Sequence, residues 1–266
     1  VDNPPVNALS PGVPEGLVDC VAQGNADPRV KAMVLRGAGR SFIAGADIKF
    51  LGQNKTEAAL TYRTIIDDSE KPIVAAIHGY ALGGGLETAL ACQYRVATED
   101  AKVGLPEVLI GVLPGGGGTQ RLPRLVGPKA ALEIIVTGRH VTAPGAKELG
   151  ILNNLATDND ALLDTAIAHA EKVADVRPLP RIRDDDSKLA ATKYDPDIFD
   201  TMRKKIARRA RNQKAPYNCI KCVEAAVELP FDEGVARERE LFDELVMADE
   251  AKSLRYAFFA ERQANK

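Results

Sequence analysis

The chain has 266 residues, enough for one large domain or for a core with an appendage. Hydrophobic residues make up 45% and charged residues 27%, a composition that is expected for a soluble globular protein. The net charge of −2 gives no global attraction to nucleic acid, and no apolar run reaches the roughly 18–20 residues of a membrane-spanning helix.

The sequence predicts strands that alternate with helices up to about Val176. Short apolar runs bounded by Pro and Gly have the length of buried strands, and apolar residues at helical spacing predict helices. This alternation is typical of an α/β fold with both faces of the sheet covered. The expected elements are a helix over 14–26, strands over 30–36 and 71–78, a helix following three glycines and ending near 91, strands over 94–98 and 102–104, and helices over 119–125, 129–137, 143–149 and 161–173.

The C-terminal third differs from the part before it. The stretch RPLPRIRDDDS, which begins at Arg177, is polar and typical of a linker, and the segment after it has helical patterns but no strand candidate. We therefore expect a core over residues 1–175 and a helical C-terminal region over 176–266. The run Arg203–Arg211 predicts a basic helix. It lacks interleaved aromatics and an acidic stretch follows it, so we do not expect nucleic-acid binding.

Cysteine and histidine positions match no metal motif. Cys219 and Cys222 form C-I-K-C, but no second pair and no neighbouring His completes a zinc site, and the spacing equally fits two small apolar residues on one helix face. The histidines His78, His140 and His169 are scattered. We expect no metal and a reduced intracellular protein, cytoplasmic in a bacterium or in an organelle such as a peroxisome or mitochondrion.

Two glycine-containing motifs fail as nucleotide sites. RGAGRSF, at 36–42, follows an expected strand but ends in Phe42 where the dinucleotide fingerprint needs Gly. Gly115–Gly118 lacks the Lys-Ser/Thr ending of a phosphate loop. Ser41 does not fit a nucleophile elbow, which argues against a serine hydrolase.

Three loop segments place glycines or small residues, and so accessible backbone N–H groups, beside an acid or a helix start. They are Phe42–Asp47, Leu82–Glu87, and Pro106–Glu107 with Pro114–Gly118. Helix N-termini carry N–H donors and partial positive charge, and such donors can hold a developing oxyanion. The alternative is structural: Gly83–Gly85 form a tight turn, Glu87 is a first-turn acid favoured by the helix dipole, and Glu107 is a surface acid.

Four stretches together resemble the crotonase (enoyl-CoA hydratase/isomerase) superfamily in order and spacing. They are FIAGADI, KPIVAAIHGYALGGGLETALAC, VGLPEVLIGVLPGGGGTQRLPRLVG and TGRHVTAPGAKELGI, and the opening NPPVNALS fits as well. The tail, with ELFDELVMADEAKSLRYAFFAERQANK, is more narrowly similar to the hydratase part of multifunctional β-oxidation enzymes. The resemblance implies an α/β spiral of ββα units, with a first strand before NPPVNALS, followed by helices that often mediate trimers. In those enzymes the chain continues into a dehydrogenase half. No dinucleotide fingerprint occurs here, so we expect that half to be absent from this sequence.

The resemblance assigns the site residues. The oxyanion donors are the backbone N–H groups of Ala46 and Gly84, and the catalytic acids are Glu87 and Glu107. Water attacks Cβ of a double bond conjugated to a thioester, and charge moves onto the thioester oxygen as an enolate. Hydration moves two protons, so Glu87 is expected to orient and deprotonate water while Glu107 protonates Cα. Coenzyme A is part of the substrate, and no separate cofactor is implied.

The matching region for coenzyme A includes Ala44, Asp47, Ile48 and Lys49, with Lys49 either a phosphate contact or a solvated lysine. The far wall of the acyl pocket is expected from the helical tail and the loop near 50–61. The expected assembly is a trimer-based homo-oligomer or a part of a longer multifunctional chain.

Other functions stay open at this point. Isomerisation of a double bond uses the same fold. Thioester hydrolysis and dehalogenation do so as well, but these usually place other side chains at the two acidic positions. A non-catalytic RNA-binding or scaffold role would use Arg203–Arg211.

Overall fold

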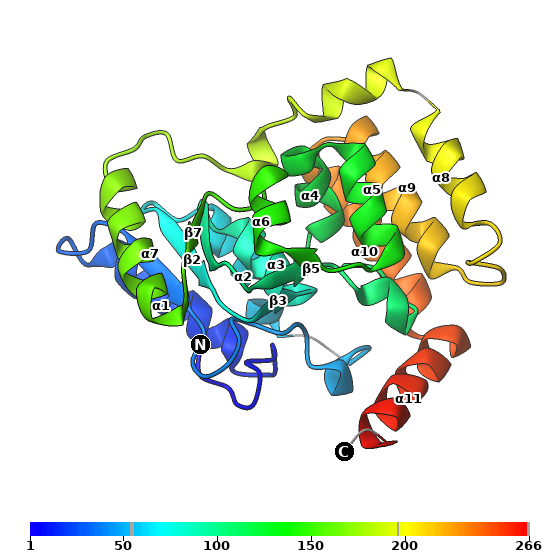
Figure 1. Cartoon of the computed structure of the whole chain (residues 1–266), viewed down its shortest axis with the longest axis horizontal. Helices are drawn as coiled ribbons and strands as arrows, with labels where there is room; N and C mark the ends of the chain where they lie inside the picture. Colours follow the sequence, from blue (N-terminus) through cyan, green and yellow to red (C-terminus); the bar gives the residue numbers. More distant parts are fainter. Residues whose placement is uncertain (54–55, 196, 265–266) are drawn as a thin grey trace. The chain divides into compact units, whose positions relative to one another are not determined.

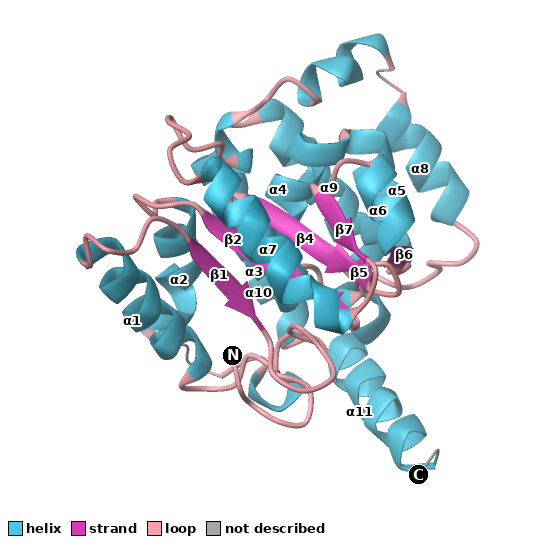
Figure 2. Cartoon of the chain, turned by 60° about the vertical axis from the view of Figure 1, so that its left-hand side comes forward, coloured by secondary structure: helices cyan, strands magenta, loops and turns pink. Residues whose placement is uncertain are grey.

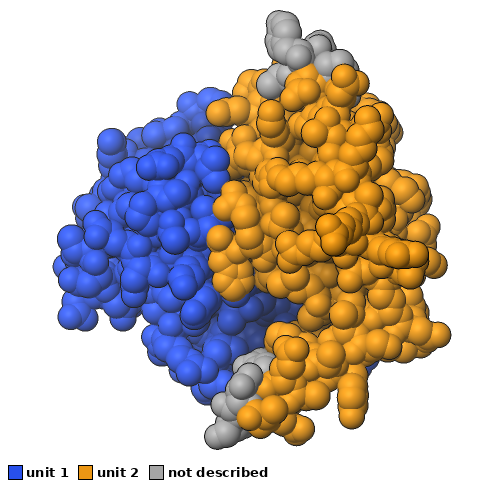
Figure 3. All heavy atoms as spheres, turned by 45° about the vertical axis from the view of Figure 1, so that its right-hand side comes forward, with its two compact units in different colours: residues 1–47, 53–103, 141–184 blue, residues 48–52, 104–140, 185–266 orange. Residues whose placement is uncertain are grey.

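A computed structural model describes residues 1–53, 56–195 and 197–264. The chain forms two compact units, coloured separately in Figure 3. Unit 1 comprises Val1–Asp47, Gln53–Val103 and Val141–Asp184, and unit 2 comprises Ile48–Gly52, Gly104–His140 and Asp185–Lys266. The two units are defined by contacts within the structure and are not shown to fold alone. The predicted division between residues 175 and 176 therefore stays a prediction.

Unit 1 contains a parallel sheet with strand order β1-β2-β4-β7 (Figure 2). The strands are β1 Met33–Arg36, β2 Ile73–Ile77, β4 Tyr94–Thr98 and β7 Asn154–Ala156. All five residues of β2 are buried, as a parallel strand covered on both faces requires. The short apolar run that predicted this strand therefore marks the centre of the sheet.

Helix α7, Asn159–Val173, covers one face of this sheet (Figure 2). Its buried side chains Leu162 and Ala166 join a core cluster with Val74, Ala76 and Val96. Val74 and Ala76 are two residues apart, so they point to the same face of β2.

Unit 1 contains three further helices, one of which carries the predicted site residues Gly84 and Glu87. They are α1 Val13–Ala26, α2 Glu57–Asp67 and α3 Gly84–Ala91. Helix α2 packs against both α1 and α3, and its N-cap Thr56 accepts a hydrogen bond from the Ala59 N–H. All eight residues of α3 are buried. A helix buried on every side must be apolar, so the carboxylate of Glu87 within it is the exception that needs an explanation.

The rest of unit 1 includes a small second sheet in the order β3-β5-β6. Its strands are β3 Tyr80–Leu82, β5 Lys102–Gly104, which reaches the start of unit 2, and β6 Val141–Thr142. The remaining elements are α6 Ala143–Glu148 and the short 3-10 helix η3 Ile182–Asp184.

Unit 2 is helical, and its elements from residue 107 onward are coloured from green to red in Figure 1. Helix α9 lies at its centre, because it packs against α4, α5, α8 and α10 and buries Cys219, Ile220 and Val223. The last helix, α11, packs against η2, which carries Glu107. The elements are η1 Ile48–Phe50, η2 Glu107–Ile110, α4 Gly118–Val126, α5 Pro128–Thr137, η4 Leu189–Tyr194, α8 Ile198–Ile206, α9 Ala215–Glu228, α10 Phe231–Val246 and α11 Asp249–Ala264.

Most expected elements are confirmed, and two have wrong bounds. The first strand begins at Met33 rather than at residue 30, because Asp27–Val30 closes a turn through the Val30 N–H and the Asp27 carbonyl. The basic run does not form one helix, since α8 ends at Ile206. Helix α2, which occupies part of the expected loop near 50–61, was not anticipated, and neither were β3, β6 and β7. Residues 54 and 55 of that loop lie outside the described residues.

Candidate active site

The loops that follow β1 and β2 meet at the carboxyl ends of these parallel strands. The Phe42 N–H donates to the His78 carbonyl at 2.9 Å, and Ile43 forms a bridge with Ala81. The Leu82 N–H donates to the Ile43 carbonyl at 3.3 Å. Two of the three glycine-containing segments expected from the sequence are therefore joined by backbone hydrogen bonds.

Glycine is required where these segments touch. A Cβ on Gly85 would lie 1.9 Å from the Ile43 carbonyl oxygen, a backbone atom that cannot move aside cheaply. Gly45 has φ +123°, in a region that favours glycine, and its carbonyl accepts from the Leu9 N–H at 2.9 Å. The glycines thus allow the segment ending at Ala46 to approach the start of α3.

This approach brings two backbone donors together. The first intrahelical bond of α3 runs from the Glu87 N–H to the Gly83 carbonyl, so the Gly84 N–H precedes the hydrogen-bonded ladder. A Cβ on Gly84 would lie 3.4 Å from the Ala46 nitrogen. No described residue accepts a hydrogen bond from the N–H of Ala46 or of Gly84. Two donors beside a helix N-terminus can bind an oxyanion.

Glu87 lies one turn into the same helix. Its side chain is 3% exposed, and its Oε2 is 3.5 Å from Nη2 of Arg63, which projects from α2. Buried charges need partners, and this guanidinium supplies one. The structure therefore places a carboxylate and two backbone donors in one neighbourhood of unit 1.

The first turn of α3 is further fixed by side chains of both helices. The Thr88 hydroxyl donates to the Gly84 carbonyl at 2.7 Å, and it is 3.0 Å from the Tyr62 hydroxyl. All of these polar atoms are buried, where hydrogen bonds hold a segment rigidly.

The residues expected to bind coenzyme A fall in both units. In unit 1 the Ala44 N–H donates to the Val6 carbonyl, and the Asp47 carboxylate accepts from the Ser10 hydroxyl at 3.0 Å. In unit 2 Ile48 and Lys49 form part of η1, with Lys49 exposed. Their role in binding coenzyme A stays a prediction.

Glu107 begins η2 in unit 2. It follows Pro106, and its carbonyl accepts from the Val112 N–H across a turn closed by Gly111, which has φ +76°. Burial, the Cys222 thiol and the carboxyl of Glu107 all raise the pKa of the Cys219 thiol, in that order of size. Glu107 thus lies against α9. Its meeting with Glu87 stays a prediction.

At the third glycine-containing segment, a carboxylate of the protein accepts hydrogen bonds from backbone N–H groups of the loop and of the helix start. The N–H groups of Gly117 and Thr119 donate to the carboxylate of Glu238 at 2.7 and 3.1 Å. Glu238 comes from α10 and is 1% exposed. A carboxylate from the protein itself therefore occupies the N-terminus of α4, as the helix dipole favours.

The described residues include the C-I-K-C pair and the three histidines noted in the sequence. Within them, no group of three or more His, Cys, Asp or Glu side chains is arranged to hold a metal ion. Cys219 and Cys222 are fully buried in α9, and burial raises the pKa of both thiols, so neither is poised as a thiolate.

The basic run is partly neutralised by acids of unit 2. Arg203 pairs with Asp200 and Glu224, and Lys205 pairs with Glu133. These pairs favour a surface helix over an RNA-binding one.

Across the described residues, no helix combines the length and apolar character needed to cross a membrane.

Sequence reasoning missed Arg63 and Glu238. The signal for Arg63 was present, because Thr56 followed by Glu57 and an apolar periodic segment is a helix start. No local signal distinguishes Glu238 from the other acids of its helix, since its partner loop lies about 120 positions earlier in the chain.

Comparisons with known proteins agree on the family. Residues 1–182 match the family model described as enoyl-CoA hydratase/isomerase. The chain is 43% identical over 273 residues to a peroxisomal bifunctional enzyme of Cavia porcellus, an alignment that covers 99% of this chain and 36% of that enzyme. It is 45% identical over 186 residues to a probable enoyl-CoA hydratase of Bacillus subtilis, covering 67% of this chain and 72% of that protein. The chain therefore spans only 36% of the length of the bifunctional relative.

Solved structures give the same fold. An enoyl-CoA hydratase from Bacillus anthracis matches with a TM-score of 0.60 and 29% identity, covering 96% of this chain and 88% of that one. An enoyl-CoA hydratase/isomerase from Pseudoalteromonas atlantica matches with a TM-score of 0.69 at 24% identity, which shows the fold alone. The expected α/β crotonase fold with a helical C-terminal region is confirmed. The chain belongs to the enoyl-CoA hydratase/isomerase family.

Proposed function

We propose that this chain is an enoyl-CoA hydratase, a hydro-lyase that adds water across the 2,3 double bond of 2-enoyl-CoA thioesters in fatty-acid β-oxidation. The observation that carries the proposal is the convergence of the Ala46 and Gly84 nitrogens beside the buried carboxylate of Glu87. Membership of the family and the names of the relatives support the same reaction.

The two backbone donors stabilise the charge that develops during addition. Attack of water at Cβ moves an electron pair toward Cα and leaves negative charge on the thioester oxygen. The N–H groups of Ala46 and Gly84 receive this oxygen, and their fixed geometry avoids reorganisation at the moment of reaction. In other enzymes the loss of one such donor costs about 10²–10³-fold in kcat.

Two carboxyl groups are needed because two protons move. Glu87, one turn from Gly84, orients the water and takes its proton as the oxygen bonds to Cβ. Glu107 supplies the proton that Cα receives, so it acts as the acid. Its arrival at the same substrate from unit 2 is part of the proposal. Coenzyme A enters with the substrate, and the reaction consumes no separate cofactor.

The direct test follows the loss of absorbance of the conjugated thioester with crotonyl-CoA. Glu87→Gln and Glu107→Gln should each lower kcat by about 10²–10⁴-fold, with a much smaller change in KM. Glu240→Gln is the matched control, because Glu240 is an exposed acid that pairs only with Arg237 among the described salt bridges. A folded Glu107→Gln enzyme with wild-type turnover contradicts the assignment of the acid.

A second assay separates hydration from double-bond isomerisation, the main alternative on this fold. Isomerisation of a 3-enoyl-CoA moves a proton between carbons without water attack. We therefore expect Glu107→Gln to abolish both reactions and Glu87→Gln to impair hydration more than isomerisation. Equal loss of both reactions in both variants would contradict the separate roles of Glu87 and Glu107.

The setting of the enzyme is also a proposal. Relatives with "bifunctional" or "multifunctional" in their names are longer chains, and several are called peroxisomal. We infer that this chain works either as part of such a polypeptide or as a trimer-based homo-oligomer. Light scattering of the purified chain distinguishes a monomer from a trimer. A peroxisome, a mitochondrion or a bacterial cytoplasm are the locations to examine by fractionation.

We propose that Ala44, Asp47, Ile48 and Lys49 bind coenzyme A. A cation at Lys49 complements the phosphate groups of coenzyme A. Lys49→Ala should therefore raise KM for crotonyl-CoA while kcat changes little. An unchanged KM would indicate a solvated lysine.

A further inference from the structure

Arg63 contacts the candidate site from α2, yet none of the family motifs described above contains it. Its side chain is 15% exposed, and its Nη2 is 3.5 Å from both Oε2 of Glu87 and the carbonyl oxygen of Gly84. The guanidinium also lies 4.4 Å from the centroid of the Tyr62 ring. One cation therefore touches the residue that supplies the carboxylate and the residue that supplies a backbone donor.

The guanidinium and the Ala46 nitrogen lie on the same side of Gly84. A Cβ on Gly84 would be 3.2 Å from Nη2 of Arg63 and 3.4 Å from the Ala46 nitrogen. Arg63 is therefore close to the proposed oxyanion donors. A side chain at this point influences where the Glu87 carboxylate lies relative to the donors.

A buried glutamate on a helix has several side-chain rotamers, and only those that face the substrate serve as a base. An ion pair restricts this choice, and it is stronger between buried groups than between exposed ones. The guanidinium of Arg63 lies 4.4 Å from the centroid of the Tyr62 ring, and the Tyr62 hydroxyl is itself 3.0 Å from the Thr88 hydroxyl of α3. The guanidinium therefore contacts α2 through Tyr62 and α3 through Glu87 and Gly84.

We propose that Arg63 is a positioning residue for hydration: its guanidinium fixes the Glu87 carboxylate in the orientation that serves the reaction. The inference rests on the proposed function, because it assumes that Glu87 is the base. It predicts that the loss of Arg63 acts through Glu87 and lowers turnover rather than substrate binding. A 1 Å misplacement in a catalytic site can cost about 10²-fold.

The test compares wild type with Arg63→Gln, Arg63→Lys, Glu87→Gln and the double variant Arg63→Gln/Glu87→Gln, using crotonyl-CoA. Arg63→Gln should lower kcat by about 10–10²-fold, within the range that misplacement causes, and change KM little. Arg63→Lys keeps the charge but not the planar fork, so it should recover part of the loss. The double variant should be no slower than Glu87→Gln alone, because Arg63 has nothing left to position.

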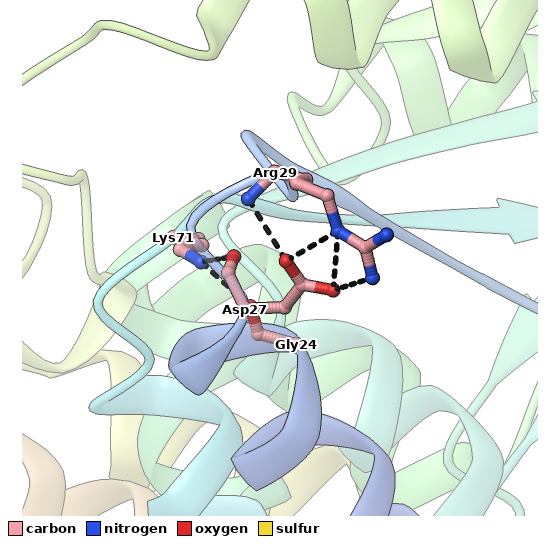
Figure 4. A network of polar contacts seen from close by, with 4 residues as sticks. All are labelled: Gly24, Asp27, Arg29 and Lys71. Atoms are coloured by element: carbon pink, nitrogen blue, oxygen red, sulfur yellow. Dashed lines mark hydrogen bonds and ion pairs between the residues drawn. The ribbon is translucent and has the colours of Figure 1, made fainter.

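Arg29→Gln is the matched control. Arg29 is an exposed arginine of unit 1 that pairs with Asp27 beside Gly24 and Lys71 (Figure 4). An exposed ion pair contributes little to stability, so this variant should keep wild-type kcat and KM. It removes the same side chain from a place outside the candidate site.

Three outcomes separate the inference from the proposed function. Wild-type kcat in folded Arg63→Gln overturns the inference. A loss that is equally large in the wild-type and Glu87→Gln backgrounds also overturns it, because Arg63 would then act independently of Glu87. Wild-type activity of Glu87→Gln contradicts the proposed function itself. If Arg63→Gln does not fold by circular dichroism, Arg63→Lys in both backgrounds makes the same comparison.

Discussion

Two glycine runs in this chain precede buried helices, yet they differ in whether the backbone N–H groups at the helix start have an acceptor within the protein. Gly83–Gly85 begin α3, and the N–H of Gly84 is left beside that of Ala46 without an acceptor among the described residues. Gly115–Gly118 lead into α4, where the carboxylate of Glu238 accepts from the loop and the helix start. The first helix start is available to a ligand, and the second already holds an anion supplied by the protein.

The difference teaches that a glycine run before a helix indicates an anion site but not its occupant. Both runs provide donors and partial positive charge. In unit 2 the anion is structural and comes from α10. In unit 1 the carboxylate of Glu87 lies one turn along the helix instead of capping it, which leaves the donors for a substrate oxygen.

The strongest test of this comparison removes one donor from the first run. Proline is tolerated at the first residue of a helix, so Gly84→Pro should fold while losing the N–H. We expect kcat for crotonyl-CoA to fall by about 10²–10³-fold. Circular dichroism checks that the variant is folded. A folded Gly84→Pro enzyme with wild-type kcat would remove the Gly84 donor from the mechanism.

The second test removes the internal anion of the other run. Glu238→Ala leaves the N–H groups of Gly117 and Thr119 buried without their acceptor, at a cost of about 1–3 kcal/mol for each donor. We expect a lower free energy of unfolding in urea but little change in kcat of the folded enzyme. Glu240→Ala on the same helix, an exposed acid, should change stability far less. A loss of kcat as large as that of Gly84→Pro would contradict a purely structural role.

A third test compares the tolerance of the two runs to added volume. A Cβ on Gly85 would lie 1.9 Å from the Ile43 carbonyl oxygen, whereas one on Gly115 would lie 2.6 Å from the ring of Phe242. Overpacking typically costs about 1–3 kcal/mol. Because a ring can shift more easily than a backbone carbonyl, Gly85→Ala should lower the unfolding free energy more than Gly115→Ala. It should also lower kcat, since Ile43 belongs to the segment that ends at Ala46. The reverse order in thermal unfolding would contradict this reading.

The smallest effect is expected in amide hydrogen exchange. A bound acyl-CoA thioester should slow exchange at Ala46 and Gly84, because their N–H groups gain an acceptor. Exchange at Gly117 and Thr119 should not change, because Glu238 already accepts from them. Mass spectrometry with site-resolved fragmentation measures all four amides in one experiment. Equal slowing at the two sets would show that the ligand acts globally.

Much of the fold follows from local patterns in the sequence. The apolar run before His78 predicts the buried strand β2, and the glycines before Leu86 predict where α3 begins. Both signals are local, because a run of apolar side chains and the backbone freedom of glycine can be recognised from adjacent residues. The family and the positions of Glu87 and Glu107 also follow from the motifs. The roles of these two acids stay predictions that the kinetic tests address.

The tertiary structure alone decides which groups complete each site. Glu238 reaches Gly117 from about 120 residues away, and Arg63 reaches Glu87 from a neighbouring helix, so no local pattern specifies either contact. Both contacts depend on how helices pack and on which side chain then becomes buried. The sequence by itself determined most of the elements, the family and the two glycine runs. Packing decided that one run keeps its donors for a ligand while the other is closed by a carboxylate, because a buried donor takes whichever acceptor the fold brings to it.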